Sequence, residues 1–342
     1  MRVAMYYNND DVRLEEMPQP QVSSGELLVK VQASGICGSD VMFWYRRHKV
    51  PLVLGHEIAG EIIEVGDDIK KYKVGQRITV SHHVPCGSCH YCLNGHSTVC
   101  ETLRKTNFSP GGFSEFVKLP KINVKKGVYL IPKNVSYEEA TFTEPLACVL
   151  RGQRLAAMKP GKSVLVIGSG ISGLLHIQMA KVNKASKIIA TDIIDFRLKQ
   201  AKKFGADEII NAKEYSCESL RKLNDGRLAD LVILCTGAKN AIKQALESVE
   251  QGGAVLVFAA TDEGVKISFD VNKLFWRNEV SLLSSYAASP KEHMEALDLI
   301  ASGKINVRDM ITHRLKLADT QKGFKLVSAA RDSIKVIIEP QK

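Results

Sequence analysis

The chain lacks several features that would place it in a broad class of protein. No apolar run approaches the ~20 residues of a membrane-spanning helix. The opening residues, MRVAMYYNNDD, contain no apolar segment of the kind found in a secretory signal. The sequence shows no internal repeat and no low-complexity stretch. We therefore expect a cytoplasmic protein that has no membrane partner.

Basic residues are in excess, but no nucleic-acid-binding motif surrounds them. The formal net charge is +10, and the lysines and arginines are dispersed. The densest cluster, at 46–49, reads RRHK and lies in no known nucleic-acid motif. We interpret the excess as a solvated surface that mildly favours anionic ligands, and we expect no nucleic-acid partner. With 342 residues, of which 45% are hydrophobic, the chain should form about two domains.

Four cysteines lie in one short stretch, VPCGSCHYCLNGHSTVC, with a C-x2-C-x2-C-x7-C spacing. Thiolates are soft anionic ligands, and four on one loop suit a closed, structural zinc site with no position for a substrate. Gly87, Asn94 and Gly95 would let the loop turn around an ion. Two disulfides are the alternative, which a reducing compartment disfavours. The predicted ligands are Cys86, Cys89, Cys92 and Cys100.

Two kinds of pattern divide the chain. Up to about residue 140 it reads as short strands and turns, such as LLVKVQASGIC. After Pro160, apolar strands such as KSVLVIGSG alternate with helical segments, which predicts βαβ units and a parallel sheet covered on both faces. An amphipathic helix and a closing strand follow from about Ser289. We expect an α/β protein with a β-rich domain over 1–150 and 289–342 and a doubly wound Rossmann domain over 151–288.

The strand KSVLVI runs into GSGISG, a G-x-G-x-x-G that opens a helix. In a βαβ unit this motif is typical of a dinucleotide site, because its glycines make a tight turn, admit the pyrophosphate and pack helix on strand. Asp192 ends the next strand, where a carboxylate would bind the ribose hydroxyls and favour NAD over NADP, although Arg197 could meet a phosphate. A bare turn and a surface acid are the alternatives. The predicted cofactor-binding residues are Gly168, Gly170, Ile171, Ser172, Gly173, Asp192 and Arg197.

Scattered residues offer a second, open metal site. Cys37 lies in GICGSD, His56 and Glu57 lie in LGHE, and Glu144 lies in TEPLAC. All four side chains are of types that bind zinc. A lone cysteine or histidine is more often part of a packed core than a ligand, so spacing alone leaves both interpretations open.

Together, these motifs give the chain a resemblance to a known family. In order they are GICGSD (35–40), GHE (55–57), the four-cysteine lobe (86–100), GGFSEF (111–116), EPLAC (144–148) and GSGISG (168–173). The chain resembles the medium-chain zinc-dependent alcohol dehydrogenases, of the sorbitol and threonine dehydrogenase branch. The resemblance implies a GroES-like β-rich catalytic domain, a Rossmann domain that binds NAD, and two zinc ions per chain, one catalytic and one structural.

By this resemblance, Cys37 and His56 bind the catalytic zinc. Glu57 and Glu144 stand where this branch carries carboxylates at or beside the metal, bound directly or through water. The zinc would act as a Lewis acid on the substrate hydroxyl, and hydride would pass to the nicotinamide. We assign catalytic as well as metal-binding roles to both glutamates.

The family pattern also places Ser39 to bind the substrate hydroxyl and to begin a proton relay. The alternative is that Ser39 only caps a helix starting at Asp40. Met42 stands where many relatives carry a relay histidine, and a thioether cannot carry a proton. His48, an ordered water or Glu57 would then have to substitute.

The carboxylate-rich metal site resembles that of enzymes that oxidise secondary hydroxyls of polyols and sugars. We expect a polyol or sugar alcohol to be oxidised to a ketone. The basic run at 46–49 would suit an acidic or phosphorylated substrate, unless it is a solvated loop. An L-threonine 3-dehydrogenase is the alternative enzyme, and a non-enzymatic relative is disfavoured by the intact site. Residues 252–286 correspond to a region of subunit contacts in relatives, which implies a homotetramer or homodimer.

Overall fold

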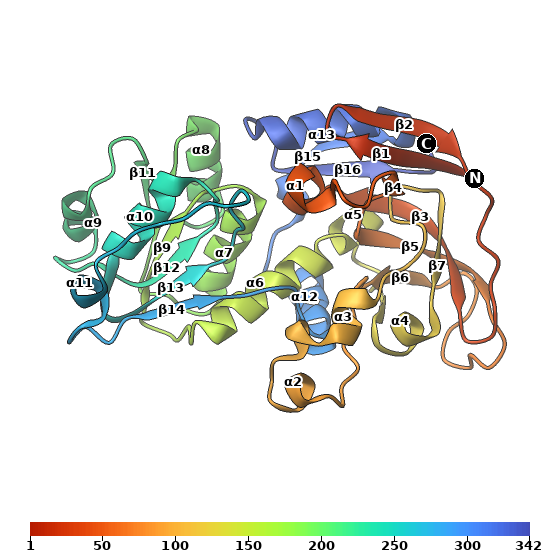
Figure 1. The fold of residues 1–342 in the computed structure, drawn as a ribbon, viewed down its shortest axis with the longest axis horizontal. Coiled ribbons are helices and arrows are strands. Elements are labelled where there is room, and N and C mark those ends of the chain that lie inside the picture. Colours follow the sequence, from red (N-terminus) through yellow and green to blue (C-terminus); the bar gives the residue numbers. More distant parts are fainter. The chain divides into compact units, whose positions relative to one another are not determined.

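The computed structural model describes residues 1–342, which form two compact units (Figure 1). The first unit contains Met1–Ala147 and Ala287–Lys342, and the second contains Cys148–Tyr286. None of the helices combines the length and the apolar character that crossing a bilayer requires.

The strands of the first unit form two sheets. The larger has the order β15-β16-β3-β5-β6-β8 with β7 paired to β3, and the smaller has the order β2-β1-β4. All pairs are antiparallel except β15 with β16. Because β16 pairs with β3, the C-terminal strand completes the sheet of the N-terminal segment. The strands are β1 (Arg2–Asn8), β2 (Asp11–Glu16), β3 (Leu27–Gly35), β4 (Leu52–Val53), β5 (Glu57–Val65), β6 (Arg77–Val80), β7 (Phe116–Leu119), β8 (Val128–Leu130), β15 (Ile311–Lys316) and β16 (Lys335–Glu339).

Helices between these strands are short, and the longer ones come late in the unit. The helix α12 begins with a capping box between Ser289 and Glu292 and has Pro290 in its first turn, where a missing N–H costs nothing. The helices are α1 (Phe43–Arg46), α2 (His90–Leu93), α3 (Glu101–Lys105), α4 (Lys121–Lys126), α5 (Tyr137–Ala140), α6 (Thr143–Leu155, which continues into the second unit), α12 (Pro290–Ala301) and α13 (Thr320–Ala329), with 3-10 turns η1 (Gly38–Val41), η2 (Ser97–Val99), η3 (Arg308–Met310) and η4 (Leu317–Asp319).

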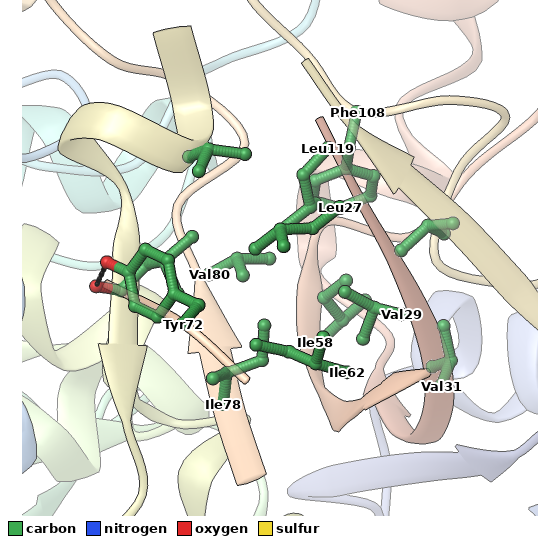
Figure 2. Packing of buried hydrophobic residues seen from close by; sticks show 13 residues of the cluster. Leu27, Val29, Val31, Ile58, Ile62, Tyr72, Ile78, Val80, Phe108 and Leu119 are labelled. Carbon is green, nitrogen blue, oxygen red and sulfur yellow. Dashed lines mark hydrogen bonds between the residues drawn. The ribbon is translucent and has the colours of Figure 1, made fainter. Parts of the chain in front are cut away.

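Alternate side chains of β3, β5 and β6 fill the core of the larger sheet (Figure 2). This alternation is the period of a strand with one face buried, and it fixes the register of the pairs, since a slip of one residue would expose the apolar set. The buried residues from these strands are Leu27, Val29, Val31, Ile58, Ile62, Ile78 and Val80.

The register of β3 and β5 positions three of the predicted metal ligands. Gly35, the last residue of β3, lies opposite Glu57, the first residue of β5. Cys37 follows β3 by two residues, and His56 immediately precedes β5. One strand pair therefore brings together ligand residues that are about 20 positions apart in the chain.

The second unit is a six-stranded parallel sheet with the order β11-β10-β9-β12-β13-β14. Every residue of β9 is buried, as expected for a strand covered on both faces. The strands are β9 (Ser163–Ile167), β10 (Lys187–Asp192), β11 (Glu208–Asn211), β12 (Ala229–Leu234), β13 (Val249–Val257) and β14 (Ser281–Ser284), and the helices are α7 (Ile171–Val182), α8 (Asp195–Lys203), α9 (Cys217–Leu223), α10 (Lys239–Glu247) and α11 (Val271–Phe275).

This sheet confirms the predicted α/β fold class. The helix α8 ends at Lys203, with its C-cap at Phe204, because Gly205 just beyond adopts a φ of +115°. A positive φ at this position ends a helix, and glycine adopts it without steric cost.

Candidate active site and metal centres

The four predicted cysteine ligands come together on the loop around α2. The sulfur of Cys86 lies 3.9 Å from that of Cys92 and 3.6 Å from that of Cys100, and the sulfurs of Cys89 and Cys92 are 3.5 Å apart. Four sulfurs at ~2.3 Å from one tetrahedral zinc stand roughly 3.8 Å from one another, whereas a disulfide requires about 2.05 Å. None of the four forms a disulfide. The sulfurs therefore fit a closed, structural zinc site.

Backbone donors prepare this lobe for a metal. The N–H groups of Ser88 and Cys89 donate to the sulfur of Cys86 at 3.5 and 3.3 Å. These hydrogen bonds lower the pKa of Cys86 to about 5. The thiolate is the form that binds zinc, so these donors favour the ligand state of Cys86, whereas burial raises the pKa of Cys92 to about 12.

Glycines turn the lobe as the sequence predicted, but Asn94 acts differently. Gly87 and Gly95 have φ values of +79° and +81°. Asn94 has an ordinary φ of −97° and caps α2, its side-chain amide donating to the carbonyl oxygen of His90 at 2.8 Å. Glycine alone supplies the left-handed conformation, and the side chain of Asn94 adds a second hydrogen bond to a carbonyl that also accepts the Asn94 backbone N–H.

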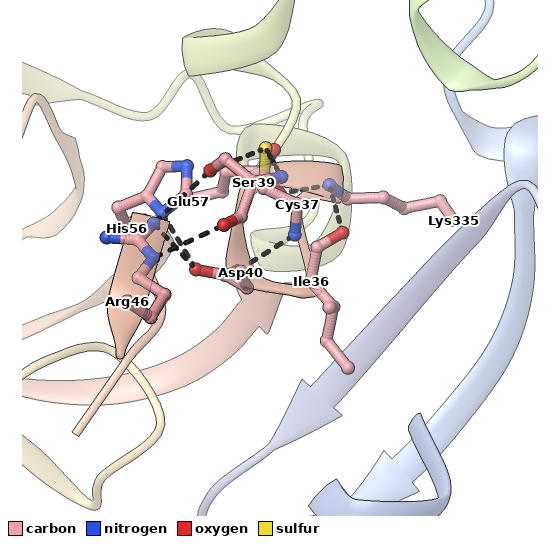
Figure 3. Close-up of polar contacts among 8 residues, drawn as sticks. All are labelled: Ile36, Cys37, Ser39, Asp40, Arg46, His56, Glu57 and Lys335. Carbon is pink, nitrogen blue, oxygen red and sulfur yellow. Dashed lines mark hydrogen bonds and ion pairs between the residues drawn. The ribbon is translucent and has the colours of Figure 1, made fainter. Parts of the chain in front are cut away.

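Cys37, His56 and Glu57 form a second group, whose ligand atoms all lie within 4.8 Å of one another (Figure 3). A thiolate, an imidazole and a carboxylate are all zinc donors, and three protein donors leave the fourth tetrahedral position for a substrate. The donor set therefore fits a catalytic zinc. Glu144, the fourth predicted ligand, lies in the first turn of α6, and its carboxylate is not part of this group.

Asp40 orients His56. It is fully buried, with Oδ1 3.4 Å from Nδ1 of His56 and Oδ2 accepting the N–H of Cys37 at 3.0 Å. This arrangement leaves Nε2 of His56 for the metal, as in carboxylate–histidine–zinc sites. Burial alone would lower the pKa of His56, but the charges of Asp40 and Cys37 raise it well above its usual value. The pocket thus favours a positive charge beside Asp40 and Cys37, and a bound cation would supply that charge.

Lys335 of β16 forms an ion pair with Glu57, and both side chains are fully buried. The ammonium also donates to the carbonyl oxygen of Ile36 at 3.4 Å and lies 5.5 Å from the ring centroid of Phe142. An unpaired buried charge costs several kcal/mol, so each of these two buried side chains needs the other as its partner. A Cβ at Gly35 would lie 2.6 Å from Nζ of Lys335 and closer still to Glu57, so only glycine fits beside the pair.

Ser39 lies next to the cluster and contacts Arg46, the first residue of the basic run at 46–49. Its hydroxyl donates to the sulfur of Cys37 at 3.5 Å and accepts from Nη2 of Arg46 at 3.4 Å. The Arg46 side chain is only 13% exposed, so the solvated-loop alternative is wrong for this residue. The helix-cap alternative for Ser39 is also wrong, because Cys37 caps η1 and Asp40 is its third residue.

The rest of the basic run faces water. Arg47, His48 and Lys49 are exposed, and Nε2 of His48 accepts from Nε of Arg47 at 3.2 Å. Met42 lies between η1 and α1. The contacts that His48 makes thus give it no link to the metal ligands, and its part in a proton relay stays a prediction.

The glycine-rich loop joins β9 to α7. Gly168 has a φ of +94°, the conformation of a tight turn. A Cβ at Gly173 would collide with the carbonyl oxygen of Gly168, so the helix and strand can pack this closely only over glycine. Ile171 and Ser172 begin α7, whose first N–H groups lack intrahelical partners. The loop therefore has the backbone of a pyrophosphate-binding turn.

Asp192 and Arg197 lie beside this loop. The Asp192 carboxylate accepts the N–H of Ser169 at 2.8 Å and that of Ile194 at 2.9 Å. A Cβ at Gly170 would stand 3.5 Å from Nη1 of Arg197, which places the guanidinium over the second glycine of the motif. The loop and these two side chains fit a dinucleotide such as NAD or NADP.

Comparison with known proteins identifies the family. Residues 23–132 match the Alcohol dehydrogenase GroES-like domain family, and residues 172–302 match the Zinc-binding dehydrogenase family. A sorbitol dehydrogenase of Bacillus subtilis (strain 168) is 30% identical over 353 aligned positions, covering 100% of this chain and 98% of the relative. The chain belongs to the medium-chain zinc-dependent dehydrogenases. The resemblance read from its motifs is confirmed, and this dehydrogenase is an NAD(P)-dependent zinc enzyme of the alcohol and polyol dehydrogenase family.

Other matches to this dehydrogenase cover almost its whole length. An L-threonine 3-dehydrogenase of Pyrococcus abyssi (strain GE5 / Orsay) is 34% identical, covering 93% of this chain and 92% of the relative. A solved structure from Sinorhizobium meliloti 1021, described as a zinc-binding dehydrogenase bound to NADP, superposes with a TM-score of 0.87 at 28% identity, covering 99% of both chains. At these identities the specific substrate of the dehydrogenase is not determined.

Sequence reasoning did not predict the contacts that three residues make at the site. Asp40 lies inside the GICGSD motif, so its position was visible but its contact with His56 was not. Arg46 was assigned with its exposed neighbours to one basic run. Lys335 lies in a strand read only as closing the fold, and its partner Glu57 is 278 positions away in the chain. No local sequence signal could have found that pair.

Proposed function

We propose that this dehydrogenase oxidises a secondary hydroxyl of a polyol or sugar alcohol to the ketone, with NAD as the hydride acceptor. The observation that carries the proposal is the group of Cys37, His56 and Glu57, an open metal site whose donors are one thiolate, one imidazole and one carboxylate. Oxygen ligands make a zinc site harder and more exchangeable. The sorbitol dehydrogenase relative supports the same substrate class.

The residues around the cluster have distinct roles in this proposal. A zinc ion held by Cys37, His56 and Glu57 would supply Lewis-acid chemistry toward the substrate hydroxyl. Asp40 fixes the ring of His56, and Lys335 fixes the carboxylate of Glu57. Ser39 is the group that hydrogen-bonds the substrate hydroxyl, takes up its proton and passes it on. Glu144 remains a proposed ligand, acting directly or through water from the start of α6.

NAD is the proposed cofactor because of the Asp192 carboxylate. It lies at the end of β10, where ribose hydroxyls are bound in this kind of sheet and where a 2′-phosphate would meet a negative charge. We expect the specificity constant with NAD to exceed that with NADP at least tenfold. An equal or higher value with NADP would contradict this assignment and would point to Arg197 as the group that reads the phosphate.

Metal analysis combined with a substrate panel tests the proposal. We expect two zinc ions per chain, one readily removed by a chelator with loss of activity. Sorbitol, xylitol and other polyols that carry secondary hydroxyls should reduce NAD faster than simple primary alcohols do. If only simple primary alcohols turned over, or if only one zinc were bound, the proposed substrate class and metal site would be wrong.

The second candidate function is the oxidation of L-threonine at its 3-hydroxyl. The relative from Pyrococcus abyssi favours it, and its name shows that the family includes amino-acid dehydrogenases. The same panel separates the two functions if L-threonine is included beside the polyols. A specificity constant for L-threonine above that of every polyol would favour the amino-acid dehydrogenase.

A further inference from the structure

Arg46 lies near the metal ligands and is linked to them through two residues, Ser39 and Asp40. Its Nη2 donates to Oγ of Ser39, which in turn donates to the sulfur of Cys37. The same nitrogen lies 3.6 Å from Oδ1 of Asp40, which contacts His56 (Figure 3). The guanidinium therefore lies two polar contacts from both Cys37 and His56.

Most of the donor capacity of this guanidinium is unused by the protein. A guanidinium has five N–H donors in a planar fork. Nε donates to the carbonyl oxygen of Ser39 at 3.2 Å and Nη2 donates to its hydroxyl, while the 3.6 Å approach to Asp40 is too long for a hydrogen bond. Nη1 has no polar protein partner, although the guanidinium lies 4.6 Å from the ring centroid of Tyr45. This largely buried arginine therefore has N–H donors available to an acceptor on a ligand.

The other charged groups at the cluster leave this role to Arg46. Lys335 is fully buried and paired with Glu57, so it cannot reach a ligand. The ring of His82 packs on that of His56 and the ring of His83 on that of His82, and His83 directs Nδ1 to the carbonyl oxygen of Thr106 at 2.7 Å. Arg46 is therefore the permanent cation with free donors beside the metal ligands.

We propose that Arg46 is a specificity-determining residue that binds an oxyanion of the substrate, a carboxylate or a phosphate ester, near the carbinol carbon. The inference rests on the proposed alcohol oxidation and narrows its substrate to sugar acids, hydroxy acids or sugar-alcohol phosphates. The physical reason is the planar fork, which matches an oxyanion with two parallel hydrogen bonds and is stronger when enclosed. A neutral polyol offers no acceptor of that kind.

The test compares matched substrates on the zinc-loaded enzyme. D-Gluconate and sorbitol 6-phosphate are each measured against sorbitol, which differs from them by the oxyanion. We expect the wild-type kcat/KM for at least one anion to exceed that for sorbitol about tenfold or more. Arg46→Gln should lower the ratio of the anion's kcat/KM to that of sorbitol by about 50-fold, as expected for the loss of charge-assisted hydrogen bonds; a loss that acts through Ser39 affects both substrates and cancels in this ratio.

Two further variants separate recognition from folding. Arg46→Lys keeps a positive charge beside Asp40 but loses the fork, so it should retain the melting temperature and zinc content and show an intermediate loss for the anion only. Arg47→Gln removes an exposed neighbouring charge and should leave the preference unchanged. Equal losses for sorbitol and the anion in both Arg46 variants would show a merely structural role and overturn the proposal.

The proposed function and this inference fail in different ways. Turnover of neutral polyols with no preference for an anion would leave the function standing and refute the inference. If no alcohol reduced NAD, the function would fail, and binding would be measured without turnover. In that case the melting temperature is measured with gluconate and with sorbitol 6-phosphate. A rise that is seen in the wild type and is absent in Arg46→Gln supports the oxyanion site, and no rise with either compound refutes it.

Discussion

At the scale of single residues, Gly35 is the position on which the buried Glu57–Lys335 pair most directly depends. A Cβ there would overlap both partners, and neither can move into solvent. We expect Gly35→Ala to lower the free energy of unfolding by about 2 kcal/mol, the usual cost of overpacking a core, and to weaken zinc binding at the open site. Urea unfolding and metal analysis measure the two effects.

The matched control for this change is Gly38→Ala, three residues further on. A Cβ at Gly38 would meet no atom within 4 Å, so stability and zinc content should stay at wild-type values. If Gly35→Ala were as stable and as rich in zinc as the Gly38 variant, the ion pair would not hold Glu57 at the metal site.

Ser39 is the residue whose hydroxyl the proposed reaction uses. Its Oγ accepts from Arg46 and donates to Cys37 in the structure, so one lone pair of the oxygen remains to accept the proton of the substrate hydroxyl. We expect Ser39→Ala to lower kcat about 100-fold, the usual contribution of a positioned acid–base group, and Ser39→Thr to retain most activity. Wild-type turnover by the alanine variant across pH 6–9 would count against this role.

At the scale of elements, the four-cysteine lobe around α2 is a brace rather than a site of chemistry. Its sulfurs are already spaced for a tetrahedral ion and leave no open position. We expect Cys92→Ser to remove one zinc per chain and to lower the melting temperature by several degrees, with activity lost only as the protein unfolds. Zinc content, a melting curve and an assay at low temperature separate these effects.

Cys217→Ser, at the start of α9, is the control for the lobe, because this cysteine lies outside both metal groups. It should keep both zinc ions and the wild-type melting temperature. Loss of activity in Cys92→Ser at a temperature where the variant remains folded would mean that the lobe takes part in catalysis directly.

Sequence predicted those parts of the fold and site that are encoded locally. The four-cysteine loop and the strand–glycine–helix motif each lie within 20 residues, so spacing alone indicated their geometry. The alternation of strands and helices likewise predicted the parallel sheet, because each βαβ unit is contiguous. The helix-cap alternative for Ser39 was wrong because Cys37 caps η1 instead, its side chain accepting the N–H of Ser39, a choice that depends on side-chain orientation.

At the scale of the whole molecule, the active site depends on contacts that no local pattern contains. β16 delivers Lys335 to Glu57 across 278 positions of sequence, and the register of β3 with β5 sets Cys37 beside His56. The burial of Arg46 likewise depends on tertiary structure, because its partner Asp40 is itself buried only once the sheet has formed. These residues could be placed only after the tertiary structure was known.

Assembly is the remaining property at this scale, and the edge strand β14 is where we expect subunits to meet. It pairs with β13 on one side only, and Leu282 is 43% and nearby Trp276 68% exposed. An open edge with exposed apolar side chains is a template for pairing with another chain. The opposite edge, β11, instead carries the Lys187–Glu208 ion pair with its neighbour β10, and charge of this kind discourages edge-to-edge association.

We therefore expect a homodimer formed by β14 of two copies, or a tetramer built from such dimers. Leu282→Lys should shift the species seen by sedimentation velocity to the monomer, because it sets two like charges close together across the pairing axis. Ile209→Lys makes the same change on β11, where the side chain is 37% exposed, and should leave the assembly intact. A monomeric wild-type chain would show that no such contact exists. Dissociation caused by the β11 variant alone would place the contact at the opposite edge, although a joined sheet should use the edge that its side chains leave open.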